Sequence, residues 1–575
     1  MPTSTLAWSR LLERLGGSVT ADRLEAALFA SKAEANHEPE RPTPALAVPG
    51  EGLEVAVTPD RLDLLSEGGL ALHLEGALGL ATGGVTLRRR RATARSLRFV
   101  VDPSTVPLRP WIAGVSVRAP TGTTLDAGLL AEAVRFQELL HATVGRDRRA
   151  MSLGIYPARR LRTPIRYAME PLSDVRFVPL DGEAPVEAAR FFEDHPLAQR
   201  YGALGRAGDR CLTLRDAEGE ILSLPPVLNS RTRGAAAPGD RALLLEATGT
   251  RERAVRDGLG LLLVVFASRG WSVGAVPVEG PGTVRSDGEV LVSNTPSELS
   301  AATLSELSGE RLPPSEVVDR FGRARLDART VRGGWRVGVP PWRPDLLAPV
   351  DLAEEVVLAG GVRPEDGLVP PSTGRGRRQS ETMFHRKVRG LLLGLGFVEP
   401  LTTVLVSDAA VARLSGVRPV HLVNPVSREF SYVRDRLLLS HLDVLSRNTR
   451  HRYPQRFAEV APVVVPLPGS ETGGDGRVRA GAILAGEGYG FADAASTVDY
   501  LLRAFDVGSV REPAELPGTI RGRAARVRVA GESVAELGEI HPQLLGEIGV
   551  PVPVAWAEVD LTALAPLLAR RDSTK

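Results

Sequence analysis

Several stretches of the chain repeat apolar residues with the period of an amphipathic helix. Between Asp126 and His141, apolar side chains recur every three or four residues and polar side chains lie between them. The stretch from Val255 to Ser268 is apolar almost throughout, which is typical of a buried helix. Further helices are predicted at 8–15, 24–31, 69–80, 303–307, 314–321 and 381–395, and a long one that is entered from 424–442 and ends near Tyr453.

Shorter stretches, rich in apolar and β-branched residues, predict strands between these helices. Residues 527–529 and 533–540 predict a hairpin that precedes a further helix. Helices and strands therefore mix along the whole chain, which indicates a multidomain α+β protein. The other predicted strands lie at 53–57, 97–101, 112–118, 151–156, 271–278, 334–339, 397–406, 457–463 and 554–561.

Glycine and proline clusters divide the chain into predicted domains. With 575 residues it is too long for a single core, and three or four domains are expected. Gly83 and Gly84 mark one break, and the proline- and glycine-rich stretch 369–378 marks another. The predicted domains are 1–84 (α+β), 85–278 (α/β), 279–365 (small α+β) and 379–575.

The composition is that of an ordinary globular protein, with 43% hydrophobic and 24% charged residues. The sequence contains no apolar run of about 18 residues and no signal-peptide pattern, so neither a membrane span nor secretion is expected. Its single cysteine, Cys211, excludes an internal disulfide and fits a cytoplasmic setting. The net charge of +2 is too balanced to indicate nucleic-acid binding by itself.

The stretch 337–361 joins an extended arm to an acidic helix. Three prolines between 340 and 344 keep the arm extended, and the helix is predicted to start at Asp351. Clustered carboxylates suit a hard cation such as magnesium, but acidic residues in a first helical turn also cap the helix and complement its dipole. Spacing alone favours the capping role. The four carboxylates are Asp345, Asp351, Glu354 and Glu355.

The sequence of this stretch resembles that of a known family. Pro340-Pro-Trp-Arg-Pro-Asp345, followed by Asp351-Leu-Ala-Glu-Glu-Val356, is similar to the signature of the phenylalanyl-tRNA synthetase β subunit. In that family, carboxylates in this arrangement contribute to a magnesium site near the α subunit. The resemblance therefore implies that Asp345, Asp351, Glu354 and Glu355 bind Mg²⁺.

Residues 85–278 resemble the editing domain of the archaeal and eukaryotic, shorter form of this β subunit. The matching segments occur in the same order as in the family: Gln137–His141, Gly145–Arg149, Leu222–Ser230 and Glu246–Thr250. One departure is Pro157, which stands where the family usually has an aspartate. The resemblance implies a site that hydrolyses tRNA(Phe) mischarged with tyrosine.

Such a site needs polar groups that bind the tyrosine hydroxyl and orient a water molecule. Residue type and resemblance point to Asn229, Ser230, Glu246 and Thr248. The alternative is that 229–230 form a turn and 248–250 a loop, and both readings can hold together. His141 and His195 are possible participants, but structural histidines are at least as common.

Residues 379–575 resemble a class II synthetase catalytic domain that has lost its catalytic elements. The family's glycine-rich third motif ending in arginine has no counterpart at 554–575, so Arg434 is expected to be a structural or interface residue. The resemblance implies an α₂β₂ tetramer in which the α subunit uses ATP and magnesium to charge tRNA(Phe). This chain would supply scaffold, magnesium ligands, RNA contacts and editing.

Two other functions stay open. A stand-alone hydrolase of mischarged tRNA would need no partner, and the retained carboxylates at 345–355 argue against it. The second alternative is a scaffold protein that has lost its editing activity, which Pro157 suggests.

Overall fold

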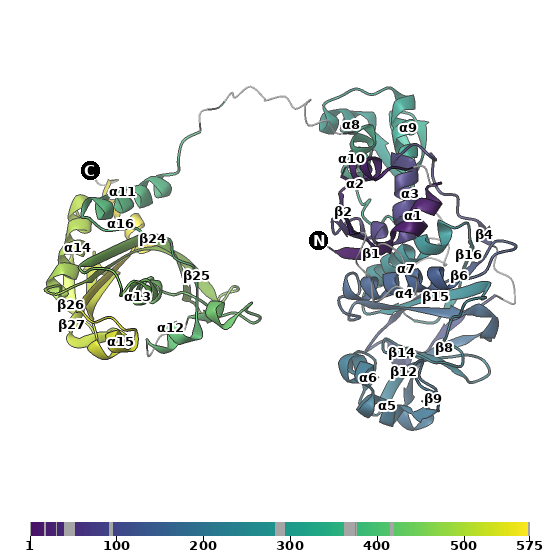
Figure 1. Cartoon of the computed structure of the whole chain (residues 1–575), viewed down its shortest axis with the longest axis horizontal. Coiled ribbons are helices and arrows are strands. Elements are labelled where there is room, and N and C mark those ends of the chain that lie inside the picture. The colour runs from purple at the N-terminus through teal and green to yellow at the C-terminus, as the bar shows by residue number, and fades with distance from the viewer. Residues whose placement is uncertain are drawn as a thin grey trace. The chain divides into compact units, whose positions relative to one another are not determined.

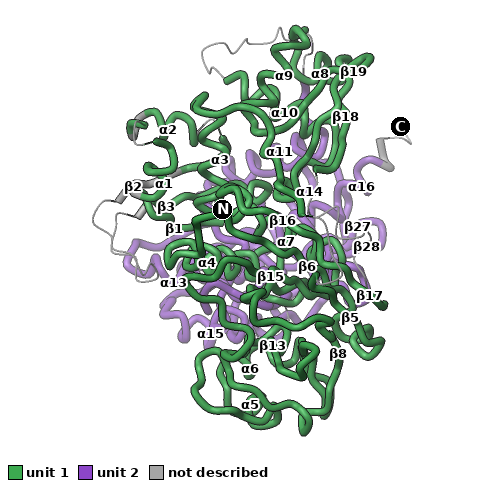
Figure 2. Tube along the Cα trace, turned by 90° about the vertical axis from the view of Figure 1, so that its right-hand side faces the viewer, with its two compact units in different colours: residues 1–368 green, residues 369–575 purple. Residues whose placement is uncertain are grey.

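The computed structural model describes residues 2–16, 19–29, 31–38, 52–90, 96–281, 294–361, 374, 376–414 and 419–572. The chain forms two compact units, residues 1–368 (unit 1) and 369–575 (unit 2) (Figures 1 and 2). Unit 1 contains three modules that follow one another in sequence, and unit 2 is built on one large sheet. The structure is thus a multidomain mixture of helices and several sheets, as the sequence predicts.

The first module packs helices against a small antiparallel sheet in the order β1 (Thr3–Ala7), β3 (Gly52–Val57), β2 (Ala33–Glu38). Its helices are α1 (Trp8–Arg14), α2 (Ala21–Phe29) and α3 (Glu67–Ala77). Ser66 caps α3 by accepting a hydrogen bond from the Gly69 amide, which explains why the helix begins here. A Cβ added at Gly76 would lie 1.9 Å from the Arg323 carbonyl oxygen, so α3 lies directly against the third module.

The second module consists of two facing sheets with a shared core. One has the order β4 (Arg89–Arg90), β16 (Ser272–Ala275), β6 (Trp111–Arg118), β15 (Ala242–Gly249), β7 (Met151–Pro157). Helices α4 (Ala127–Ala142) and α7 (Glu252–Ala267) cover its other face (Figure 1). Both are the amphipathic and apolar helices that the sequence predicts.

The facing sheet has the order β14 (Leu228–Asn229), β13 (Ile221–Leu224), β12 (Arg210–Arg215), β8 (Ile165–Pro171), β5 (Phe99–Val101), β17 (Val278–Glu279), with β11 (Arg206–Ala207) beside β12. Side chains from both sheets meet in one apolar cluster that includes Phe99, Tyr156, Tyr167 and Leu244. The short helices α5 (Ala188–Asp194) and α6 (Pro196–Tyr201) lie at the end of this module, with strands β9 (Arg176–Phe177) and β10 (Val186–Glu187).

The third module is a three-stranded antiparallel sheet, β18 (Thr295–Ser300), β20 (Gly334–Val339), β19 (Asp327–Val331), covered by α8 (Ala301–Ser308), α9 (Pro314–Arg323) and α10 (Pro349–Gly360). Helix α10 begins at Pro349, two residues earlier than the sequence predicts. Asp351 therefore lies in the third position of the helix, where its Oδ2 accepts the backbone N–H groups of Leu347 (2.8 Å) and Ala348 (2.7 Å).

Unit 2 is a six-stranded antiparallel sheet in the order β24 (Gln455–Pro466), β25 (Gly474–Ala485), β29 (Val554–Asp560), β28 (Glu532–Ile540), β27 (Thr519–Val529), β26 (Val510–Pro513). Helices α11 (Ser380–Gly394), α14 (Phe491–Ala504) and α16 (Leu561–Asp572) share one apolar core with the sheet. The short helix α12 (Asp408–Ala412) packs with α13 (Leu438–Arg447) and α15 (Pro542–Glu547) in a second core. Successive residues such as Ile483 and Leu484 fall in different cores, as strand geometry requires.

The hairpin predicted at 527–540 is present as β27 and β28, but the predicted long helix is wrong. Helix α13 spans only Leu438–Arg447. Before it, Tyr432 and Val433 form a short strand, β23, that pairs with β21 (Leu405–Val406) and β22 (Val420–His421). Tertiary pairing here overrides the helical pattern.

The contact between α3 and the third module gives a testable prediction. Gly76→Ala should destabilise unit 1 by on the order of 1–3 kcal/mol, because the new methyl group has no space beside the Arg323 backbone. Gly390→Ala is the matched control: Gly390 lies in α11 with nothing within 4 Å, and alanine there should stabilise the helix by about 0.5–1 kcal/mol. Differential scanning calorimetry of the two variants measures both effects, and an equal change in both would contradict the packing described.

Candidate functional site

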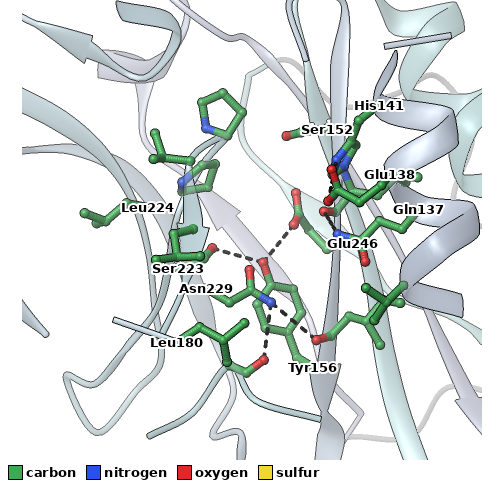
Figure 3. A pocket seen from close by; sticks show the side chains of 18 of the residues that line it. Gln137, Glu138, His141, Ser152, Tyr156, Leu180, Ser223, Leu224, Asn229 and Glu246 are labelled. Carbon is green, nitrogen blue, oxygen red and sulfur yellow. Dashed lines mark hydrogen bonds and ion pairs between the residues drawn. The ribbon is translucent and has the colours of Figure 1, made fainter. Parts of the chain in front are cut away.

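A pocket of about 270 Å³ lies in the second module, between α4, strands β7 and β15, and the turn that joins β13 to β14 (Figure 3). Its walls are mostly apolar, and a few polar side chains project into it. The apolar lining includes Leu130, Val134, Leu153, Ile155, Leu180, Leu197 and Leu224, and the polar lining includes Gln137, Glu138, His141, Ser152, Ser223, Asn229 and Glu246.

Glu246 lies at the centre of the polar lining. On β15 it pairs with Gly114 on one side and Gly154 on the other. A Cβ at Gly154 would lie 2.3 Å from the Tyr156 hydroxyl, so only glycine leaves that ring its place. The hydroxyl of Tyr156 donates to Glu246 Oε2 at 3.0 Å and lies 3.0 Å from the Ser223 hydroxyl (Figure 3).

The carboxyl group of Glu246 has a raised pKa. Its side chain is buried, and burial raises its pKa to about 7, although the Tyr156 hydrogen bond acts in the opposite direction. Its Oε1 has no hydrogen-bond partner among the described residues. A buried polar atom without a partner is costly, so this oxygen is available to a ligand that brings a donor.

Thr248 lies behind the pocket and holds a buried arginine. The Arg109 guanidinium donates to the Thr248 hydroxyl (3.1 Å), the Thr248 carbonyl (2.8 Å) and the Ser152 hydroxyl (3.1 Å). Burial lowers the pKa of Arg109 to about 10, which leaves it charged at neutral pH. Thr248 thus belongs to the support of the site and does not line it.

Asn229 and Ser230 also divide between the two roles. Asn229 lines the pocket and donates to the Gly234 carbonyl at 3.2 Å. Ser230 is fully buried in the turn, where its hydroxyl donates to the Ile221 carbonyl at 2.6 Å and accepts the Gly234 amide at 3.2 Å. Of the four predicted pocket residues, Asn229 and Glu246 line the cavity, whereas Ser230 and Thr248 hold its walls.

Glu138 is a pocket residue that the sequence did not single out. Arg148 Nη2 donates to both of its oxygens at 3.0 Å, and His141 Nδ1 lies 3.2 Å from Oε1. Burial alone would raise the pKa of Glu138, but these partners outweigh it and lower the pKa to about 2. Glu138 therefore stays ionised as one half of an ion pair with Arg148, and its side chain is about half exposed at the pocket. The motif Gln137–His141 contained this residue, but only the fold shows its partners.

The two histidines have structural hydrogen bonds. His141 Nε2 accepts the Leu153 amide at 2.8 Å, burial lowers the pKa of its ring, and its Nδ1 lies 3.2 Å from Glu138. His195 caps α6 by accepting the Leu197 amide, and it does not line the pocket. Pro157 pairs with Leu243 at the end of β7 and is likewise not among the lining residues.

The four carboxylates predicted to bind magnesium have other partners. Arg343 donates to both oxygens of Asp345 (2.9 and 2.7 Å) and both of Glu355 (3.2 and 2.8 Å). Asp351 caps α10, and the exposed Glu354 forms an ion pair at 2.7 Å with the half-buried Lys32.

The fit to a metal ion follows from these contacts. The described residues contain no group of three or more His, Cys, Asp or Glu side chains placed to hold a metal ion. Arg343 already neutralises Asp345 and Glu355, and backbone N–H groups occupy Asp351. The four carboxylates do not fit a magnesium site formed by this chain alone.

In unit 2, Arg434 has structural contacts. It is fully buried, donates to the Ser440 hydroxyl at 3.0 Å and the Pro462 carbonyl at 3.1 Å, and lies 3.6 Å from Glu459. Nearby segments of the same unit expose apolar side chains almost completely: Leu401 (100%), Val423 (98%) and Val426 (100%). In the parts of both units that the structure describes, no helix has the length and apolar character needed to span a membrane.

Comparison with known proteins places this architecture in a family. Residues 368–561 match the model of the phenylalanyl-tRNA synthetase beta chain CLM domain, and residues 297–361 match the tRNA synthetase B5 domain. A phenylalanine–tRNA ligase beta subunit from Aeropyrum pernix is 33% identical, covering 99% of this chain and 100% of that protein. One from Korarchaeum cryptofilum is 31% identical, covering 89% of this chain and 92% of its own length.

A solved structure agrees in fold with the N-terminal part. The crystal structure of an N-terminal fragment of the phenylalanyl-tRNA synthetase beta-subunit from Pyrococcus horikoshii superposes with a TM-score of 0.56 at 23% identity, covering 63% of this chain and 100% of the fragment. The identity of 33% to the Aeropyrum pernix protein, over nearly the full length of both chains, shows that this chain belongs to the family of phenylalanine–tRNA ligase β subunits.

Proposed function

We propose that the pocket beside Glu246 hydrolyses tRNA(Phe) that carries tyrosine, within a ligase whose α subunit attaches phenylalanine. The observation that carries this proposal is a largely apolar pocket into which Glu246 brings a buried carboxylate oxygen with no hydrogen-bond partner among the residues that the structure describes. The module 85–278 is then the editing domain. Residues 379–575 act as a class II synthetase-like domain without synthetic activity, and residues 1–84 and 279–365 as supporting domains.

Recognition of tyrosine follows from the polarity of the pocket. Apolar walls suit an aromatic ring, and Oε1 of Glu246 accepts the hydroxyl that phenylalanine lacks. When phenylalanine enters, the same oxygen stays unpaired, and this is how a polar site rejects an analogue that lacks the hydroxyl. Tyr156 and Ser223 hold Glu246 in place for this contact.

Glu138 supplies the second anchor. An aminoacyl ester carries an α-ammonium group, and the ionised, half-exposed Glu138 would share its carboxylate between that group and Arg148 at the same pocket. In the reaction, water adds to the ester carbonyl carbon, the bond to the ribose oxygen breaks, and free tyrosine and tRNA leave. Holding the substrate at both ends fixes the ester for that attack.

Assembly with the α subunit would use unit 2. Leu401, Val423 and Val426 are almost completely exposed, and a partner that covers such side chains gains free energy from their burial. Because Arg434 is committed to structural contacts, ATP and its magnesium are assigned to the α subunit of an α₂β₂ tetramer, which also shares the tRNA.

Magnesium would depend on the partner as well. Of the four acidic residues at 345–355, Glu354 is the exposed one and is paired with Lys32, which Asp60 shares, so it is the one able to turn toward a metal ion at a subunit interface. Glu355 is held by Arg343 and Arg61, whose charges lower its pKa to about 2 against the effect of burial.

The first functional prediction concerns Glu246. Glu246→Ala should slow the deacylation of tyrosyl-tRNA(Phe) by the tetramer at least about tenfold, because the hydroxyl loses its acceptor. Aminoacylation with phenylalanine should stay unchanged. Glu218→Ala, an exposed carboxylate of the same module, is the control and should edit normally. Both rates are measured with labelled tRNA, and equal editing by the two variants would show that Glu246 does not bind the hydroxyl.

The second concerns Glu138 and the α-ammonium group. Wild-type tetramer should deacylate tyrosyl-tRNA(Phe) at least about tenfold faster than the same tRNA esterified with hydroxyphenylpropanoic acid, which lacks the amino group. Glu138→Gln should remove most of that preference by slowing only the amino substrate. A variant that slows both esters equally would mean that Glu138 only supports the fold.

The third concerns the exposed apolar side chains of unit 2. Val426→Asp together with Leu401→Asp should weaken association with the α subunit at least about tenfold, because charge replaces surface that the partner would bury. Val510→Asp, at a valine that is 64% exposed on β26, is the control. Co-purification and sedimentation measure assembly, and a loss of assembly in the control alone would place the interface elsewhere.

A further inference from the structure

A second cavity in unit 1 lies where four helices end. Its volume is about 400 Å³. Helix α2 ends at Phe29, α3 at Ala77, α9 at Arg323 and α10 at Gly360. Most of the lining is contributed by the last turns of these helices, whose apolar side chains are mainly alanines with two leucines: Ala26, Ala27, Ala77, Leu78, Ala324, Leu358 and Ala359.

The floor of this cavity is a buried ionic network. Arg61 donates to both oxygens of Asp63, at 3.0 and 2.9 Å. Arg343 does the same for Glu355, and Arg61 and Glu355 both line the cavity. Because every carboxylate here already faces a guanidinium, the floor is rigid and does not need a ligand to neutralise it.

His73 is the exception within this floor. It projects from α3, lines the cavity, and its Nε2 is buried with no hydrogen-bond partner among the described residues. Burial and the Arg61 charge lower the pKa of His73 to about 3, so the ring is neutral at physiological pH. A neutral imidazole nitrogen either donates or accepts, depending on the tautomer, and leaving it unpaired is costly.

The charges around the cavity favour a ligand without net charge. The four charges that act on His73 are Arg61, Arg343, Asp63 and Glu355, two of each sign. The helix ends present partial negative charge and carbonyl acceptors, whereas the exposed Arg23 and Arg323 at the rim oppose that charge. An ammonium group would meet the arginines, and a carboxylate would meet the helix ends.

We propose that this cavity binds a small neutral molecule with an apolar body and one hydroxyl group, which hydrogen-bonds to His73 Nε2. The small side chains make room for the apolar body, and the hydroxyl matches a nitrogen that is able to donate or accept. This site is separate from the pocket beside Glu246 and does not depend on the proposed editing function, because no residue lines both cavities.

Three probes of the same shape test the head-group assignment on the full-length chain: cyclohexylmethanol, cyclohexylmethylamine and cyclohexanecarboxylate. Isothermal titration calorimetry at neutral pH should show one site per chain for the alcohol, and binding of the amine and the carboxylate that is at least about tenfold weaker. Preference for either charged probe, or no binding of the alcohol, would overturn the proposal.

Two variants locate the binding. Ala359→Phe fills the cavity from α10 and should abolish binding of the alcohol, whereas Ala504→Phe, at an exposed position of α14, should leave it unchanged. His73→Phe keeps the ring and removes its nitrogens, so it should weaken binding about tenfold. Circular dichroism confirms that each variant folds. If Ala359→Phe still binds the alcohol, the alcohol binds at another site. If His73→Phe binds it as tightly as the wild type, the proposed hydrogen bond to His73 is wrong.

Discussion

The alternation of side chains along β15 is the constraint on which the second module depends. Leu243, Leu245 and Ala247 enter the core under α4 and α7. The intervening Leu244 faces the opposite sheet, and Glu246 shares that face. Because successive side chains of a strand point to opposite faces, a slip of one residue would bury Glu246 among leucines and bring Leu245 into the pocket. The apolar core therefore fixes the register that gives the pocket its carboxylate.

Buried charges in unit 1 fall into two kinds, and the difference separates structure from function. Arg343 holds Asp345 and Glu355 with short hydrogen bonds to both carboxylates, which leaves little for a ligand to gain. Removing one partner of such a cluster would leave an uncompensated buried charge, which is strongly destabilising. Glu246, by contrast, accepts a hydrogen bond from Tyr156, its Oε1 makes no hydrogen bond among the described residues, and burial raises its pKa to about 7 although Tyr156, Arg109 and Thr248 act to lower it. Incomplete pairing of this kind is typical of a site that awaits a substrate.

The pattern of apolar residues predicts an element correctly where the segment follows a single helical or strand periodicity throughout. Helices α4 and α7 and the β27–β28 hairpin appear where the sequence predicts them. The acidic segment was harder, because spacing along one helix says nothing about Arg343, which lies on the arm two residues before Asp345 and takes up two of the four carboxylates. Resemblance identified the stretch correctly as a family signature. Only the folded structure shows the hydrogen-bond partners of these acidic side chains, and those partners decide what each side chain does.

Glu138 shows why the sequence alone does not identify every residue of the pocket. Its partner Arg148 ends a run of three non-glycine residues with positive φ, at 49°, 57° and 63° for Arg146, Asp147 and Arg148. Each of these three residues costs about 1 kcal/mol or more in backbone strain, and no sequence pattern predicts such a turn. The turn brings the Arg148 guanidinium onto Glu138, onto the Val227 carbonyl at 2.9 Å and over the Tyr201 ring at 4.5 Å. One arginine thus joins α4, the turn before β14 and α6. The strained conformation persists because these contacts fix it, and in doing so they fix the three elements that enclose the pocket.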